Sequence, residues 1–330
     1  MKLVLAVVFG QAISLAVCFI DVIAKALNLH GSHFSAFLDF GGYAMLALIF
    51  LPAHYVRWSA SPYDALKLPA TDEGAGGEAL GTADKFAGLK VLAVALTDAA
   101  AAYTATVAYQ HNVSVASVAL LNSFAIPCAM LLSYFMLGAR YTARHGLGVS
   151  LALTGLVVVV VADVQKASDG KADPDSVYGD ALTLLSAALY ALSNVLSEKL
   201  VKSGSMSFFL AWLGVGGAIL MGLQTGVFEP GLVIGAPWSV DAAVPLLYVA
   251  FTLLFAFVYA MCAKYLAMYD AVALNLSFLS TNVYGVVLGV LLFDEVFQWL
   301  SMIGFCFIVG GLTVYHWPAR APVAVDEQTA

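Results

Sequence analysis

The chain has 330 residues, 62% of them apolar, and only 11% are Asp, Glu, Lys or Arg. Its mean hydropathy is +0.91, and this composition excludes an ordinary water-soluble domain, which needs a charged surface around its core. The net charge of −7 and the lack of a basic stripe exclude nucleic acid as a partner.

Ten apolar runs follow one another, each about as long as a helix that crosses roughly 30 Å of hydrocarbon. Lipid offers no partner to unpaired backbone amides, so we expect every run to be helical, and long runs without alternation exclude a barrel. Ser114, Ser205, Asp241 and Asp270 stand where helix-capping residues belong. The runs cover residues 3–26, 35–58, 86–110, 114–137, 143–163, 177–202, 206–228, 241–267, 271–293 and 297–317.

The distribution of Lys and Arg predicts how these helices are oriented. If the amino terminus is cytoplasmic, ten spans place every Lys and Arg on the inner side except Lys25, Lys166 and Lys171. This asymmetry follows the positive-inside rule, so both termini are expected in the cytoplasm.

The two halves of the chain resemble each other. Gly148, Gly155 and Leu156 recur as Gly304, Gly311 and Leu312. Five spans in each half would insert the second half upside down, as in many secondary transporters, although short apolar matches also arise by chance. We therefore expect an all-α membrane protein with two inverted five-helix repeats, 1–163 and 177–317, joined by an outer linker, 164–176. A disordered acidic cytoplasmic loop, 58–85, and a cytoplasmic tail, 318–330, complete the predicted organisation.

Asp98 is the most informative polar residue, because it lies near the middle of the third run with apolar neighbours on both sides. A charge at this depth costs roughly 2.5–3.5 kcal/mol on insertion scales, so it usually faces a cavity or a partner. The functional interpretation is substrate or proton binding. The structural alternative is a buried acid that is hydrogen-bonded to a Ser or Tyr of another helix.

Other polar residues fall on single helix faces. Gln11, Ser14, Cys18, Asp21 and Lys25 form one stripe in the first run, which we expect to face the bundle interior. Amides, hydroxyls and rings on several helices predict a cavity for a planar polar molecule. We expect no metal site and no cofactor. The candidate substrate-binding residues are Asp98, Tyr103, Tyr109, Gln110, Asn122, Tyr190, Asn194, Glu198, Tyr259, Asn275, Asn282 and Tyr284.

Several strings resemble one known family. Residues 291–295 (LLFDE), followed by Gly304, Gly310 and Gly311, are similar to the ninth-to-tenth-span ending of the drug/metabolite transporter superfamily. Residues 108–110 (AYQ), 120–127 (LLNSFAIP), 139–141 (ARY) and 189–195 (LYALSNV) resemble subfamily F of solute carrier family 35.

This resemblance implies a secondary transporter. Subfamily F has been linked to uptake of queuine and its nucleoside queuosine, and other branches of family 35 carry nucleotide sugars. Asp98, Tyr103, Tyr109, Gln110, Tyr190, Asn194 and Glu198 fall on positions shared with the subfamily, whereas Ala100 and Asn122 stand where relatives often have acids. Fewer acids weaken the case for a cationic substrate.

The favoured hypothesis is alternating-access transport of a small, uncharged or weakly cationic heterocycle, not an enzymatic reaction. A nucleotide-sugar exchanger of the Golgi would need buried cations for its phosphates. Of the Lys and Arg residues within the runs, only Lys25 and Lys264 qualify as candidates, and both lie toward the ends of their runs. A membrane scaffold or receptor without transport is the third possibility. The expected partners are a small-molecule substrate and the bilayer, for a monomer or homodimer in the plasma membrane or the Golgi and endomembrane system.

Overall fold

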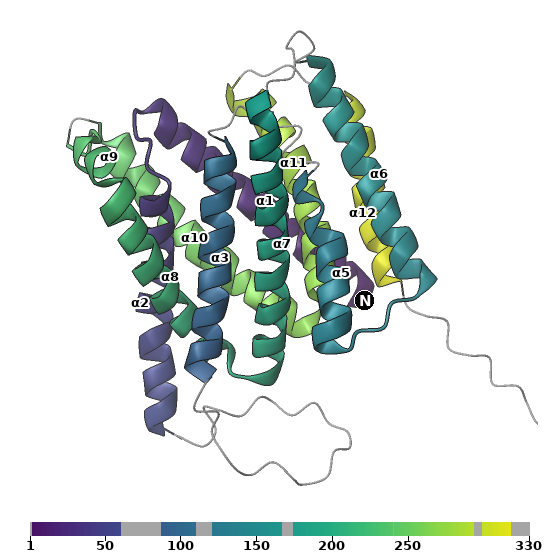
Figure 1. Ribbon diagram of the computed structural model, residues 1–330, viewed down its shortest axis with the longest axis horizontal. Coiled ribbons are helices and arrows are strands. Elements are labelled where there is room, and N and C mark those ends of the chain that lie inside the picture. The colour runs from purple at the N-terminus through teal and green to yellow at the C-terminus, as the bar shows by residue number, and fades with distance from the viewer. Residues whose placement is uncertain are drawn as a thin grey trace, which may run out of the picture.

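A computed structural model describes residues 2–60, 87–109, 121–166, 174–239, 241–293 and 299–317. All the regular structure in these ranges is helical, and the helices form one bundle (Figure 1). In chain order they are α1 (Lys2–Leu29), α2 (Ala36–Ala60), α3 (Ala87–Tyr109), α5 (Ala125–Leu137), α6 (Ala143–Lys166), α7 (Pro174–Ser203), α8 (Met206–Phe228), α9 (Pro230–Gly235), α10 (Ala243–Met268), α11 (Ala271–Phe293) and α12 (Trp299–His316).

The helix boundaries agree closely with the apolar pattern in places. The predicted runs 206–228 and 271–293 coincide with α8 and α11. The short α9 was not predicted; Pro230 stands in its first turn, where a fixed φ favours a helix start. Helices also extend into the predicted connections, since α2 continues to Ala60, α6 continues to Lys166 and α7 begins at Pro174. The rest of the predicted loop 58–85, the middle of the linker 164–176 and the tail 318–330 lie outside the described residues.

Two of the four predicted helix caps are confirmed. The Asp270 carboxylate accepts the N–H of Ala273 at 2.9 Å, and the Asp241 carboxylate accepts the N–H of Ala243 at 2.9 Å. Ser205 occupies the N-cap position of α8, as predicted, but its hydroxyl interacts with Ser207 at 2.9 Å and makes no cap bond. Ser114 lies outside the described residues.

The bundle has the dimensions and surface of a membrane protein. Six helices in the described part of the chain are long and apolar enough to cross a bilayer, and three shorter helices are also apolar. Large apolar side chains point outward, such as Leu48, Phe135 and Leu223, which are each more than half exposed. Such a surface is stable where the surrounding solvent is hydrocarbon.

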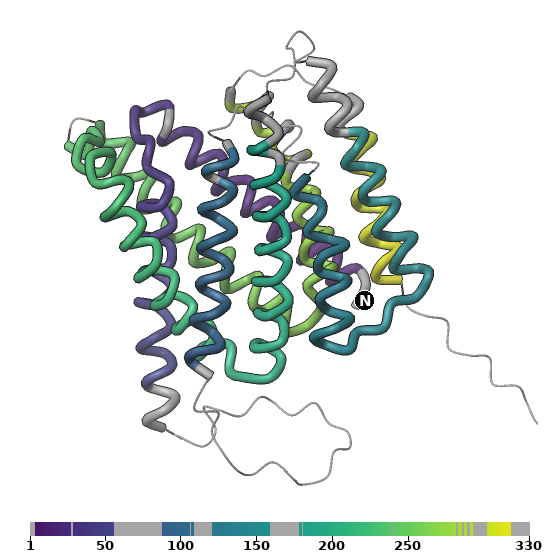
Figure 2. Tube along the Cα trace, viewed as in Figure 1, coloured from purple at the N-terminus to yellow at the C-terminus, as the bar shows by residue number. Residues whose placement is uncertain are grey.

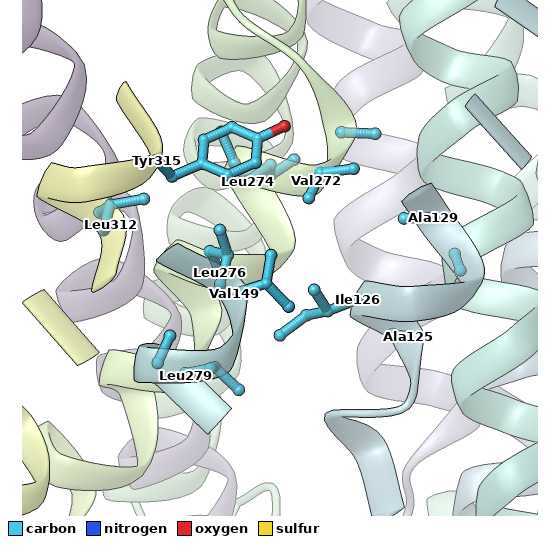
Figure 3. Close-up of a cluster of buried hydrophobic side chains, with 14 of the residues drawn as sticks. Ala125, Ile126, Ala129, Val149, Val272, Leu274, Leu276, Leu279, Leu312 and Tyr315 are labelled. Atoms are coloured by element: carbon cyan, nitrogen blue, oxygen red, sulfur yellow. The ribbon is translucent and has the colours of Figure 1, made fainter. Parts of the chain in front are cut away.

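Two buried apolar clusters support the bundle. One lies among α5, α6, α11 and α12 and includes Ile126, Val149, Leu276 and Leu312 (Figure 3). The other lies among α2, α3, α8 and α10 and includes Leu46, Val94, Leu210 and Phe251. Tyr43 belongs to this second cluster and Tyr259 packs against it.

Small residues allow the closest helix pairings. The pairs α2·α8 and α6·α12 have the most extensive contacts in the bundle, and they form its two opposite edges in Figure 1. A Cβ on Gly148 of α6 would lie 2.7 Å from the carbonyl oxygen of Gly311 of α12, and a Cβ on Gly155 would lie 2.5 Å from that of Gly304. Only glycine permits such backbone contact.

One carboxylate organises the end of the bundle where α2 begins. Glu229, which is buried, accepts the N–H groups of Ser35, Ala36 and Phe37 and the hydroxyl of Ser35, all at 3.0 Å. These amides would otherwise be unpaired at the start of α2, and a negative charge is favourable there. At the same end, His30 contacts Asp241 at 2.5 Å.

Candidate functional site

Four helices meet around the carboxylate of Asp98. Asp98 lies in the middle of α3 and is only 7% exposed. The hydroxyl of Tyr259 on α10 donates to its Oδ2 at 2.6 Å, the hydroxyl of Tyr43 on α2 bonds the same oxygen, and Ser193 on α7 donates to Oδ1 at 3.1 Å. We call Tyr43, Asp98, Ser193 and Tyr259 the Asp98 cluster. Its members come from both halves of the chain.

Packing fixes the two tyrosines of this cluster. The Tyr43 ring lies directly against Gly217 of α8, where a Cβ would overlap it, and it is 1% exposed. The Tyr259 ring stacks on Phe255 with centroids 4.4 Å apart, and Phe255 also contacts the edge of Tyr43. The hydroxyls are therefore held toward the carboxylate by rings that have little room to move.

The chemistry of the cluster is that of a hydrogen-bonded acid without a cation. The donors described for Asp98 are hydroxyls, and none of the ion pairs found in the described ranges includes it. Hydrogen bonds to a charged group contribute about 1.5–3 kcal/mol each. Hydroxyls can also exchange for the N–H groups of a ligand, so this geometry suits a substrate-binding acid as well as a structural one.

A second polar pair continues from the cluster along α7. Asn194, the residue after Ser193, donates from Nδ2 to Oδ1 of Asn275 on α11 at 3.2 Å. Asn275 is buried and donates in turn to the carbonyl of Ala271 at 2.7 Å. Consecutive residues of α7 thus contact α3 on one side and α11 on the other.

The interface between α1 and α11 is polar as well. Tyr284 donates its hydroxyl to Oε1 of Gln11 at 2.8 Å, and Ser14 donates to the carbonyl of Ser277 at 2.6 Å. Gln11 Nε2 is buried without a hydrogen-bond partner among the residues that the structure describes. The predicted stripe of the first run is confirmed for Ser14 and Cys18, which are buried, but Asp21 and Lys25 are exposed.

Glu198 binds to the start of a neighbouring helix. Its Oε2 accepts the N–H of Ala271 at 2.7 Å, and its Oε1 accepts Nζ of Lys202 at 2.6 Å. It therefore caps α11 from the last turns of α7, next to the Asp270 cap. Both carboxylate oxygens already have protein partners, which is the environment of a structural acid.

The remaining candidates differ in position. Tyr103 is 42% exposed and stacks on Phe228 with centroids 6.1 Å apart. Asn122 is exposed and Tyr190 is half-buried. Tyr109 lies in α3 and Asn282 lies in α11, but the structure does not describe their side chains. Gln110 lies outside the described residues.

Sequence reasoning missed Tyr43 and Ser193. Ser193 directly precedes the candidate residue Asn194, so a hydroxyl in the middle of the run 177–202 was an available signal. Tyr43 is one of 15 tyrosines, and only the packing against Gly217 and Phe255 distinguishes it.

Comparisons with known proteins agree on one family. The family model described as Solute carrier family 35, F branch, matches residues 79–317. The chain is 30% identical to "Solute carrier family 35 member F2" of Xenopus tropicalis over 98% of this chain and 79% of that protein. It is 34% identical to the mouse protein of that name over 68% of this chain, and it spans 60% of the mouse protein's length.

More distant relatives extend the likeness. "Uncharacterized solute carrier family 35 member C320.08" of Schizosaccharomyces pombe is 27% identical over 86% of this chain and 52% of its own length. A solved crystal structure superposes with a TM-score of 0.68 at 18% identity, covering 94% of this chain and 97% of that one, which shows a common fold. The chain is an integral multi-pass membrane protein and belongs to subfamily F of solute carrier family 35.

Proposed function

We propose that this chain is a secondary transporter that moves a small, uncharged or weakly cationic heterocycle, of the queuine or queuosine kind, by alternating access. The observation that carries the proposal is the Asp98 cluster. A carboxylate in the middle of a membrane bundle is expensive, and this one joins helices from both halves through exchangeable hydroxyl bonds.

We further propose ten membrane spans in two inverted repeats. The proposal pairs α1 with α7, α2 with α8, α3 with α10, α5 with α11, and α6 with α12. Exchanging the halves then converts the contact α1·α11 into α5·α7, and the contact α3·α8 into α2·α10, and the structure contains all four. The reciprocal contacts of Gly148 with Gly311 and Gly155 with Gly304 follow the same relation. These pairings support an inverted duplication.

The proposed orientation places both termini in the cytoplasm. The start of α1 and the end of α12 lie near each other at one end of the bundle (Figure 2). Lys90 in the first turn of α3 and Lys202 in the last turn of α7 lie at the same end of the bundle, where α3 begins and α7 ends (Figure 1). The positive-inside rule assigns this end to the cytoplasm.

The substrate class follows from the charge and shape of the cluster. Asp98 can accept N–H groups of a ring or an exocyclic amine, and the tyrosine rings nearby suit a flat heterocycle. Phosphate would be repelled by the same carboxylate. A ligand must replace at least one of the hydroxyls on Asp98. The bonds from Ser193 and Tyr259 cross between the proposed halves, so replacing them would loosen one half from the other.

Uptake into proteoliposomes tests this function directly. Wild-type protein should accumulate a labelled nucleobase or nucleoside, and Asp98→Asn should reduce that uptake while the purified protein remains folded. Thr97→Val is the matched control, because the neighbouring Thr97 hydroxyl bonds only its own helix, at 2.8 Å to the carbonyl of Val94. Unchanged uptake in Asp98→Asn would remove this carboxylate from the mechanism.

The same assay separates the alternatives. Exchange of a labelled nucleotide sugar for its monophosphate would show that the substrate is a nucleotide sugar, as for a Golgi exchanger, and not a heterocycle. Uptake of none of these compounds by folded protein would favour a scaffold or receptor, in which Asp98 only joins helices.

A further inference from the structure

Four aromatic rings pack together at the end of the bundle where α2 begins. Phe34 precedes α2 and Phe37 lies in its first turn, whereas Trp238 follows α9 and Tyr248 lies in α10. Each ring contacts the other three, with centroids 4.9–6.4 Å apart. Phe34 stacks on Trp238 at 5.4 Å and Phe37 stacks on Tyr248 at 4.9 Å, so both stacked pairs join the first half of the chain to the second. We call these four residues the ring quartet.

Hydrogen bonds and a glycine position the quartet. Trp238 donates its indole N–H to the carbonyl of Val233 at 2.7 Å, and Tyr248 donates its hydroxyl to the carbonyl of Phe37 at 3.3 Å. Gly41 leaves room for the Tyr248 ring against α2, because a Cβ there would press on the Tyr248 hydroxyl. The contact between α2 and α10 is therefore made by rings on one side and nearly bare backbone on the other.

Aromatic side chains continue along α10 from the quartet to the Asp98 cluster. Tyr259 follows Tyr248 by eleven residues, roughly 16 Å along a helix. Between them Phe255, which is 7% exposed, stacks on Phe251 with centroids 6.0 Å apart and on Tyr259 with centroids 4.4 Å apart. The quartet thus lies about half a bilayer away from Asp98. A solute at Asp98 could leave between α2 and α10 at this end only if these rings moved apart.

Rings at this depth have a simpler explanation, as anchors at the membrane surface. Anchoring rings face the headgroups, whereas Phe34 is only 2% exposed and the other three rings pack against the same buried cluster as Phe34. The opposite end of the bundle also differs. In the proposed repeat, the contact of α2 with α10 corresponds to that of α8 with α3, and residues 87–102 of α3 include no Phe, Trp or Tyr. The quartet is therefore a feature of one end only.

We propose that the ring quartet is the gate that closes the outer side of the transport pathway, and that the structure has this gate shut. The inference rests on the proposed transport function and on the proposed orientation, in which α2 begins at the outer surface. Opening separates Phe37 from Tyr248 and Phe34 from Trp238. Stacked rings suit a reversible closure, because separating them breaks few polar interactions.

A reversible cross-link between α2 and α10 tests the gate. A Cβ on Gly41 would lie 3.0 Å from Oγ1 of Thr252, so Gly41→Cys with Thr252→Cys places two thiols within reach of a disulfide. The four free cysteines of the chain are first replaced by alanine. Oxidation should then lower heterocycle uptake in proportion to the fraction of cross-linked chains, and reduction should restore it. The two single variants should not respond to oxidation. Undiminished uptake by cross-linked chains would overturn the proposal.

A second measurement does not depend on which compound is transported. Cys262 lies one turn beyond Tyr259 on α10, close enough to Asp98 for the two groups to interact electrostatically, so its thiol reports access to the Asp98 cluster. The other three cysteines are replaced by alanine, and a membrane-impermeant thiol reagent is added to right-side-out vesicles. Phe37→Ala with Trp238→Ala removes one ring from each stacked pair. This variant should be labelled about tenfold faster or more, since a minor conformation is populated at roughly 0.1–10%.

Two controls separate a gate from general loosening. Phe228→Ala removes an exposed ring near the same end of the bundle and should not change the labelling rate. Inside-out vesicles of the Phe37 and Trp238 double variant should show no rise. Equal rises from both faces, or no rise from the outer face, would overturn the proposal.

Failure of the gate and failure of the proposed function give different results. If the reduced cysteine variant takes up no heterocycle but Cys262 labelling responds as expected, the gate is supported and the proposed substrate is wrong. If uptake occurs and neither the cross-link nor the loss of the rings has an effect, transport is supported and the gate is wrong.

Discussion

Gly148 and Gly311 face each other across α6 and α12 so closely that a Cβ on either would press on the carbonyl oxygen of the other, at 2.7 and 2.5 Å. Further along the same two helices, Gly155 makes the same kind of contact with Gly304. At these positions the backbones of α6 and α12 approach each other directly, because there is no room for a side chain on the glycines. This relationship leads to a first prediction.

Gly148→Ala should lower the free energy of unfolding by about 1–3 kcal/mol, the usual cost of adding a methyl group to a well-packed interface. The measurement is unfolding of purified protein in a denaturing detergent titration, followed by helical circular dichroism. Gly146→Ala is the control, since a Cβ there has nothing within 4 Å. Equal stability of the Gly148 variant and wild type would show that the helices separate at little cost.

Gly217→Ala should displace the Tyr43 ring and so disturb the Asp98 cluster without touching any polar group. The added methyl group overlaps the ring, and a buried ring in a close-packed interior cannot move aside without disturbing its neighbours. The fractional loss of uptake should exceed the fractional loss of unfolding free energy. Gly226→Ala on the same helix lies in open space and should transport normally; equal uptake in both variants would contradict the importance of Tyr43.

Tyr259→Phe keeps the ring that stacks on Phe255 but removes the hydrogen bond to Asp98. We expect a loss of about 1.5–3 kcal/mol in unfolding free energy, the range for a bond to a charged group. Tyr248→Phe on the same helix should cost less, because its hydroxyl makes only a 3.3 Å bond to the carbonyl of Phe37.

A double-mutant cycle with Asp98→Asn checks that the Tyr259 effect acts through Asp98. The two substitutions should be non-additive, as expected for residues in direct contact. Additive effects would show that the Tyr259 hydroxyl contributes independently of Asp98, for example through its 3.0 Å contact with the Tyr43 hydroxyl.

Glu229→Ala should destabilise the chain by about 2 kcal/mol, because it leaves the first amides of α2 without their acceptor. Glu229→Gln should have an intermediate effect: one oxygen can still accept from Ser35 and Ala36, but an NH₂ group would face the N–H of Phe37. The comparison is again by detergent unfolding. A variant with alanine that unfolds like wild type would mean that water caps α2 equally well.

The helical fold was readable from the sequence because lipid restricts the options so strongly. A run of apolar residues in a membrane protein has to satisfy its backbone internally, so length and composition alone placed α8 and α11 correctly. The ends were less predictable. Ser205 has the right residue type for a cap, but a hydroxyl two residues later competes for it.

The site was only partly readable, for a different reason. Asp98 stood out because its burial is costly, whatever its partners are. Periodicity places Asn194 and Glu198 on one face of α7, but it cannot say which helix lies opposite. In the structure, Asn194 hydrogen-bonds to the side chain of Asn275, and Glu198 accepts a hydrogen bond from the backbone at the start of α11. Tyr43 was missed because its role arises from packing between α2, α8 and α10, which no local pattern encodes.

The adjacency of Ser193 and Asn194 has a mechanical consequence. Neighbouring side chains on a helix project about 100° apart. Ser193 of α7 therefore hydrogen-bonds to Asp98, while the next residue, Asn194, hydrogen-bonds to Asn275. A rotation of α7 about its long axis that breaks the Ser193–Asp98 hydrogen bond would also strain the Asn194–Asn275 hydrogen bond. In the proposed transport mechanism, a solute that replaces the Ser193 hydroxyl on Asp98 would therefore also change the contact of Asn194 with Asn275 near the start of α11.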